Sequence, residues 1–271
     1  MPTAGHPVLQ RLLSAHTRCY FYDRAGYDKS DLNHDIQVVL SDDTAKELDA
    51  LMNAVGVAPP YLLVAHSYGG IVARSYLELS SENVAAMVLV DSARELLYEV
   101  LHRFPRKELE VVIDGVYLET INHLREECGY TDKEWDRMLD GIQKSRAGSH
   151  KEDTRTSGRW LASKGQFEKT AMGGKPLSVI KCDLAGDYRK IFDEGVRRGN
   201  GTEEDRNRGE ELVKGLEWFN DELVAAQLRL STSNVYVKIQ DCGHDLPMRR
   251  PAVIVEAVKW ALERVTNTCA Q

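Results

Sequence analysis

Ser67 has the setting of a catalytic nucleophile. It lies in the segment VAHSYGG, residues 64–70, between a short apolar run and a helical pattern. A serine on such a strand-to-helix turn is strained with its oxygen exposed, and the residues two positions away must be small, as Ala65 and Gly69 are. The following helix directs its N-terminal N–H groups at a developing oxyanion, so the N–H of Tyr68 is the natural donor. The plain alternative is a serine that only caps a helix.

His244 is the candidate general base. It ends the segment QDCGH, residues 240–244, which follows the last predicted strand and precedes the last predicted helix. A histidine there can take the proton of Ser67 and return it to a leaving group. A lone loop histidine is more often a surface residue, so this assignment depends on Ser67.

Three aspartates compete for the role of the acid that orients His244. Asp91 ends the strand that follows the serine, whereas Asp183 and Asp187 lie in the predicted loop after the next strand. The acid holds the imidazole in the correct tautomer and stabilises its charged form. Each aspartate can instead be a loop or helix cap. We favour Asp91, because the later loop carries no clear acid motif.

The elements that must position these residues alternate between short apolar runs and longer helical patterns. This predicts an α/β fold with a mostly parallel open sheet of about five strands and flanking helices. Such sheets keep their ligand sites at the carboxyl ends of the strands. The predicted strands are Arg18–Tyr22, Tyr61–Ala65, Ala85–Val90, Leu177–Lys181 and Val235–Gln240. The predicted helices are Val8–Ser14, Ser41–Val55, Gly70–Leu79, Glu210–Leu230 and Pro251–Val265.

Residues 94–174 differ from the rest, since they are charged, rich in helix formers and without a strand signal. We expect them to form a helical cap, inserted between the third and fourth predicted strands, over the carboxyl edge of the sheet. The core would then comprise residues 1–93 and 175–271. The polar stretch 197–209 is expected to be a loop or a fraying helix.

Composition excludes several classes of protein. The 271 residues carry a net charge of -7, which argues against nucleic acid or an anionic membrane as the main partner. The expected partner is a small-molecule substrate. The apolar runs are too short to span a bilayer, and no secretory signal opens the sequence, which predicts a cytoplasmic location. The five cysteines form no CxxC pair, and no phosphate or dinucleotide glycine motif occurs. Neither a metal nor an organic cofactor is therefore expected.

Three segments resemble motifs of the α/β-hydrolase superfamily, in the same order along the chain. Residues 22–30, YDRAGYDKS, are similar to its D-x-x-G-x-G-x-S turn, with Asp28 where a glycine is usual. Residues 65–69 resemble its nucleophile elbow, and Gly243-His244 resembles its histidine loop. The resemblance leaves the cap unexplained and covers about residues 8–95 and 175–271.

Family members normally begin with about three more strands, and a loop after the third supplies a second oxyanion N–H. No residue before Arg18 can serve, because His6-Pro7 lacks the glycine of that loop. The resemblance therefore implies a truncated α/β-hydrolase fold, with a gap between the first and second predicted strands. Either the natural start lies upstream, or the chain is a short form whose oxyanion hole is weakened or absent. Losing one donor costs about 100- to 1000-fold in rate.

The expected function is that of a serine hydrolase, a carboxylic-ester hydrolase that acts on an ester, thioester or lactone of a small, partly apolar molecule. The reaction would pass through an acyl-enzyme on Ser67. The alternative is a non-hydrolytic or weakened member for ligand binding or natural-product tailoring, which the missing donor favours and the Ser67–His244 pair disfavours. Acyl transfer to an alcohol or amine would use the same residues. Asp23 and Arg24 are expected to pair and to brace the loops near the site.

Overall fold

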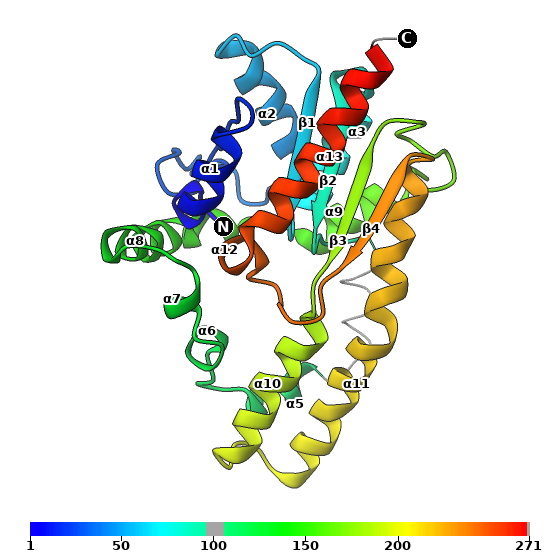
Figure 1. Cartoon of the computed structure of the whole chain (residues 1–271). Helices are drawn as coiled ribbons and strands as arrows, with labels where there is room; N and C mark the ends of the chain where they lie inside the picture. Colours follow the sequence, from blue (N-terminus) through cyan, green and yellow to red (C-terminus); the bar gives the residue numbers. More distant parts are fainter. Residues whose placement is uncertain (96–105, 270–271) are drawn as a thin grey trace.

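A computed structural model describes residues 1–95 and 106–269. Its centre is a parallel sheet in the order β1-β2-β3-β4 (Figure 1). The strands are β1 (Tyr61–His66), β2 (Val84–Val90), β3 (Leu177–Lys181) and β4 (Asn234–Lys238). The predicted α/β class with a mostly parallel sheet is therefore confirmed.

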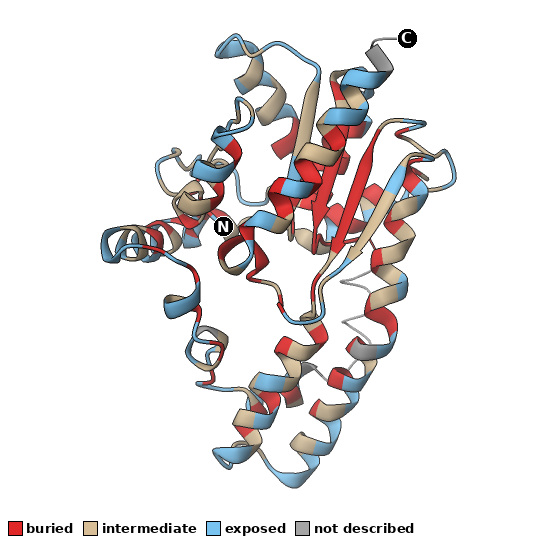
Figure 2. Cartoon of the chain, viewed as in Figure 1, coloured by how far each residue is buried: buried red, intermediate tan, exposed pale blue. Residues whose placement is uncertain are grey.

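Alternation along β2 explains how the sheet is buried on both faces. Met87 and Leu89 pack into one apolar cluster with side chains of α3, while Val88 and Val90 pack into a second with side chains of α1 and α13. Successive side chains of a strand point to opposite faces, so one strand serves both clusters. Figure 2 shows the central strands as the most buried part of the molecule.

Helices flank the sheet on both faces and continue beyond its carboxyl edge (Figure 1). Those around the sheet are α1 (Pro7–Ser14), α2 (Ser41–Ala54), α3 (Gly69–Leu79), α12 (Leu246–Arg249) and α13 (Pro251–Cys269). Between β2 and β3 lie α5 (Arg106–Val112), α6 (Leu118–Ile121), α7 (Leu124–Glu127), α8 (Asp132–Ser149) and α9 (Thr154–Ala162). Between β3 and β4 lie α10 (Leu184–Arg197) and α11 (Glu203–Ala225). Short 3-10 turns are Thr3–Gly5, Ser81–Asn83 and Ala226–Leu230.

The predicted strand Arg18–Tyr22 is wrong. Within the described residues, no backbone ladder joins this segment to the sheet, and β1 has only β2 as a neighbour. Cys19 and Phe21 still pack against the apolar cluster under α13, while Tyr20 is exposed. The near-continuous apolar run is present, but a strand also needs a partner strand beside it, and the segment has none among the described residues.

The loop expected after β3 is also wrong, because α10 begins at Leu184. Its apolar residues Ala185, Tyr188, Phe192 and Val196 recur at helical spacing and pack against α5 and α11. Residues 197–209 are expected from the sequence to form a loop or a fraying helix. Only the part between the end of α10 at Arg197 and the start of α11 at Glu203 is a loop.

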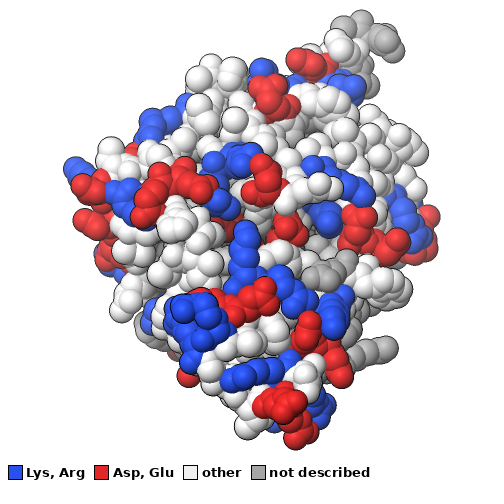
Figure 3. All heavy atoms as spheres, turned by 60° about the horizontal axis from the view of Figure 1, so that its bottom comes forward, with Lys and Arg blue, Asp and Glu red and all other residues white. Residues whose placement is uncertain are grey.

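The helices of the predicted cap pack in different places. Helix α5 packs with α10 and α11, whereas α8 lies against the N-terminal turn and α9 against α3. Helix α5, before the predicted boundary at residue 174, therefore shares one apolar cluster with α10 and α11, which lie after it. The division into core and cap stays a prediction. Figure 3 shows acidic and basic side chains interspersed over the face that contains the tips of α10 and α11.

Candidate active site

Ser67 forms the junction between β1 and α3. Its φ of 55° lies in the left-handed region, which is rare for a residue other than glycine. Main-chain hydrogen bonds hold it there, since its N–H donates to the carbonyl of Val90 at 3.3 Å and its carbonyl accepts from Ala93 N at 2.8 Å. Backbone strain of this kind costs about 1–3 kcal/mol and persists where the surroundings enforce it.

Helix α3 comes closest to the chain that follows β2 at Gly70. A β-carbon on Gly70 would lie 2.2 Å from Cβ of Ser92, so only glycine fits. A β-carbon on Gly69 would meet only Cβ of Ala65, at an ordinary 3.9 Å. The predicted need for small residues two positions from Ser67 is therefore mild, and alanine is accommodated at position 65.

The imidazole of His244 lies between the serine and an aspartate. Its Nε2 is 3.0 Å from Oγ of Ser67, and its Nδ1 is 2.6 Å from Oδ2 of Asp91. The carboxylate only accepts, so Nδ1 carries the hydrogen and Nε2 is left to accept the hydroxyl proton of Ser67. Three residues that are widely separated in the sequence thus form one continuous line of hydrogen bonds.

Asp91 is held rigidly at the end of β2. Its φ is 38°, its side chain has no exposed surface, and its N–H donates to the carbonyl of Ile180 at 2.8 Å. Burial alone would raise the pKa of Asp91, but the hydrogen bond and charge of His244 outweigh it and hold that pKa below its ordinary value. The carboxylate is therefore ionised at neutral pH.

The pKa of His244 lies above its ordinary value. Burial alone would lower it, but the hydrogen bond and charge of Asp91 outweigh burial, with further contributions from Asp187 and Asp245. This is the electrostatic setting that stabilises an imidazolium once it has taken a proton.

The two competing aspartates do not contact the imidazole ring. Asp183 caps α10, its side chain accepting from Gly186 N at 3.0 Å. Asp187 accepts from the main-chain N–H of His244 at 2.7 Å. Local sequence could not show this second contact, because it depends on how α10 packs against the loop after β4.

Two side chains beside the serine have structural partners. Nε2 of His66 is 2.9 Å from the carbonyl oxygen of His244, and the two rings lie 4.4 Å apart between centroids. The hydroxyl of Tyr68 is 3.1 Å from Oγ of Ser157, in the interior. The Tyr68 residue stands at the N-terminus of α3, and the oxyanion role of its N–H stays a prediction.

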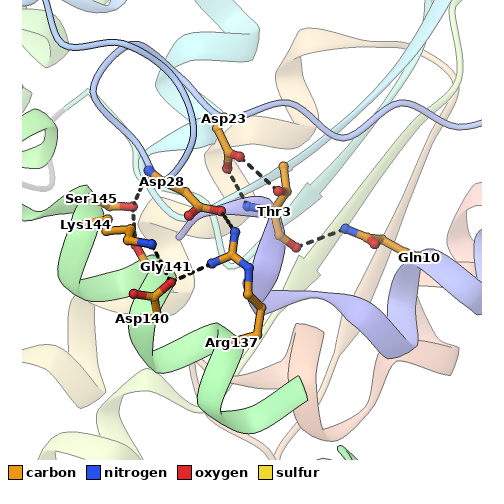
Figure 4. A network of polar contacts seen from close by, with 9 residues as sticks. All are labelled: Thr3, Gln10, Asp23, Asp28, Arg137, Asp140, Gly141, Lys144 and Ser145. Carbon is orange, nitrogen blue, oxygen red and sulfur yellow. Dashed lines mark hydrogen bonds and ion pairs between the residues drawn. The ribbon is translucent and has the colours of Figure 1, made fainter. Parts of the chain in front are cut away.

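The expected Asp23–Arg24 pair is replaced by two separate contacts. Arg24 binds Glu152 with two hydrogen bonds of 2.7 and 3.1 Å, and Tyr27 donates to the same carboxylate at 2.8 Å. Asp23 accepts instead from the main chain and hydroxyl of Thr3, at 2.7 and 3.0 Å (Figure 4). Each side chain thus ties the turn to a segment distant in sequence.

Asp28 lies in the turn of residues 22–30, at the position where the resembling motif has a glycine. Its φ of 45° is in the left-handed region. Its N–H donates to Ser145 at 3.1 Å, and its carboxylate pairs with Arg137 of α8 (Figure 4). Arg137 also contacts Asp140, at 3.3 Å. These bonds fasten the turn to α8 and give no sign of direct chemistry.

Within residues 1–95 and 106–269, no group of three or more histidine, cysteine, aspartate or glutamate side chains is arranged to hold a metal ion. No helix in the same part of the chain is long and apolar enough to cross a membrane.

Comparison with known proteins identifies the family. The model of the alpha/beta hydrolase family matches residues 3–257, so the chain belongs to that family. An AB hydrolase superfamily protein from Gibberella zeae is 28% identical over 271 residues, 95% of this chain and 82% of that protein. A probable transporter, efuK, from Hormonema carpetanum is 28% identical over 266 residues, 94% of this chain. The chain spans only 37% of that second relative's length.

Solved structures show the same fold at low sequence identity. A thermophilic esterase from Thermogutta terrifontis is 18% identical, with a TM-score of 0.56 over 98% of this chain and 86% of that one. A putative acyltransferase from Salmonella enterica is 15% identical, with a TM-score of 0.58 over 97% of this chain and 86% of that one.

Proposed function

We propose that this chain is a serine hydrolase for an ester, thioester or lactone of a small, partly apolar molecule. Ser67 attacks the carbonyl carbon while Nε2 of His244 takes its proton, and Asp91 stabilises the resulting imidazolium. The tetrahedral oxyanion accepts a hydrogen bond from the N–H of Tyr68. Its collapse expels the alcohol or thiol, which receives the proton from His244, and leaves an acyl group on Ser67.

Water then completes the cycle, with water as the nucleophile and Ser67 as the leaving group. His244 takes a proton from water, the hydroxide attacks the acyl carbonyl, and Ser67 leaves with the proton returned to its oxygen. No metal ion or redox step is required by this sequence of bond changes.

The observation that carries the proposal is the continuous line from Ser67 Oγ through His244 to Asp91, at 3.0 and 2.6 Å. The left-handed backbone of Ser67 supports it, because such strain gathers at reactive sites. Family membership is compatible with hydrolysis and leaves the substrate open, since one fold hosts many activities.

Intact-mass analysis after treatment with a fluorophosphonate probe tests the proposal. We expect one adduct on the parent chain, none on Ser67→Ala, and one on Ser163→Ala, which removes an exposed serine outside the site. A positive result leads to a screen of esters and lactones, with added alcohols or amines to detect acyl transfer. A folded parent chain without an adduct, or an adduct that survives in Ser67→Ala, would overturn the proposal.

A further inference from the structure

We propose that Asp187 is a positioning residue for the reaction, which acts by holding the main chain of His244. This inference rests on the proposed function of Ser67 and His244. It assigns His244 two carboxylates with separate tasks. Asp91 orients the ring through Nδ1, whereas Asp187 fixes the main chain through the N–H.

The need for such a hold follows from where His244 lies. The residue belongs to the irregular segment between β4 and α12, outside any strand or helix. Regular main-chain bonds therefore do not fix its position. A displacement of about 1 Å in a catalytic group can cost about 100-fold in rate.

The contact between Asp187 and this segment is close and buried. Oδ2 of Asp187 accepts from His244 N at 2.7 Å, and the residue is only 3% exposed. A β-carbon on the neighbouring Gly243 would lie 1.8 Å from the same oxygen. The carboxylate thus occupies the space beside residue 243 and binds the next N–H along the chain.

His66 holds the other end of the same residue. The carbonyl oxygen of His244 can only accept, so Nε2 of His66 donates to it, at 2.9 Å. Burial and the nearby His244 hold the pKa of His66 well below its ordinary value, so the ring is neutral. His244 is thereby bonded at its N–H, its carbonyl and both ring nitrogens.

The charge state of Asp187 reflects its crowded surroundings. Burial raises its pKa to about 6, and the like charge of Asp245 adds to this rise. Its Oδ1 has no hydrogen-bond partner among the described residues. The N–H of His244, Lys190 and the charge of His244 act in the opposite direction. Burial raises the pKa values of the Cys182 and Cys242 thiols, and the charge of Asp187 adds to this rise, so both thiols stay neutral.

Two substitutions separate the hydrogen bond of Asp187 from its charge. Asp187→Ala removes the acceptor, and we expect labelling of Ser67 by the fluorophosphonate to slow about 10- to 100-fold at pH 8. Asp187→Asn keeps an oxygen that can accept the same N–H, and we expect labelling within about threefold of the parent.

Loss of the negative charge in Asp187→Asn also lowers the pKa of His244, so the acid limb of the labelling rate moves to lower pH. Asp183→Asn is the matched control, because asparagine caps a helix as well as aspartate does and Asp183 does not contact His244. We expect this control to keep both the rate and the pH profile of the parent.

Titration of histidine ring signals by NMR gives a readout that does not depend on labelling. We expect the pKa of His244 to fall in Asp187→Asn and to stay at the parent value in Asp183→Asn. A parent chain that fails to label while this shift occurs would defeat the proposed function and leave the interaction of Asp187 with His244 intact. A folded Asp187→Ala variant that labels at the parent rate would overturn the role of Asp187 in holding the main chain. An unchanged His244 pKa in Asp187→Asn would overturn the expected effect of the Asp187 charge on the ring.

Discussion

Replacing Asp91 by asparagine should reduce the reactivity of Ser67 more than any other single change outside Ser67 and His244. The amide of asparagine can donate to Nδ1 of His244, which moves the ring hydrogen to Nε2. In that tautomer Nε2 cannot accept the proton of Ser67. The side chain at position 91 is fully buried, so water cannot replace the lost carboxylate.

The size of this effect follows from the contact between Asp91 and His244. Two unit charges about 4 Å apart attract by about 4 kcal/mol at an effective dielectric constant of about 20, which corresponds to about 10³-fold in rate. The wrong tautomer adds to this loss, so we expect labelling to slow about 10³- to 10⁴-fold in Asp91→Asn. The second-order rate of fluorophosphonate labelling, measured at pH 8 on chains that melt cooperatively, provides the assay.

The comparison with Asp187 makes the test specific. If Asp91→Asn labels within about tenfold of the parent while Asp187→Asn loses its reactivity, the acid is Asp187 and the assignment of Asp91 is refuted. Retained reactivity in both variants would refute the need for either carboxylate.

Two substitutions and one pH profile provide further tests of the structure. Arg24→Ala leaves the Glu152 carboxylate buried without its cation, so the free energy of unfolding should fall by about 3–5 kcal/mol in urea titrations. The labelling rate per reactive site should change little. Unchanged stability together with a collapsed labelling rate would contradict this. Gly70→Ala forces a β-carbon against Ser92 and should cost about 1–3 kcal/mol by the same measurement, whereas a neutral result would show that the turn relaxes freely. The labelling rate of Ser67 should rise with pH through the pKa of His244, because the neutral ring is the proposed base. Since that pKa is raised, the midpoint of the pH profile should lie above 6.5. A midpoint below 6.5 would contradict the pairing of His244 with Asp91.

Local sequence pattern predicts where Ser67 and His244 lie relative to the strands, while their roles in the reaction stay a prediction. Ser67 directly follows β1, which a run of apolar residues indicates, whereas His244 lies in the segment between β4 and the next helix. A strand-to-helix turn can be recognised from a few neighbours. Local pattern does not select Asp91, because three aspartates end or follow strands and only packing decides which one reaches Nδ1 of His244.

Two of the errors concern partners that are distant in sequence, and one concerns a helix. The segment Arg18–Tyr22 has the apolar run of a buried strand, but a ladder also needs a neighbouring strand, which local pattern does not reveal. Arg24 pairs with Glu152 of a helical region far along the chain, not with its neighbour Asp23. Helix α10 is missing from the predicted elements although its apolar residues recur at helical spacing, and the bond from His244 N to Asp187 depends on how this helix packs.

The proposed acyl-enzyme on Ser67 is tested most directly by looking for it during turnover. The parent chain is mixed with an activated acetate ester, quenched in acid within the first turnover, and analysed by intact mass and peptide mapping. We expect a single acetyl group on Ser67 that decays as the ester is consumed, and none in Ser67→Ala. An acetyl group on another residue, or ester hydrolysis at the parent rate by Ser67→Ala, would contradict the assignment of Ser67 as the nucleophile.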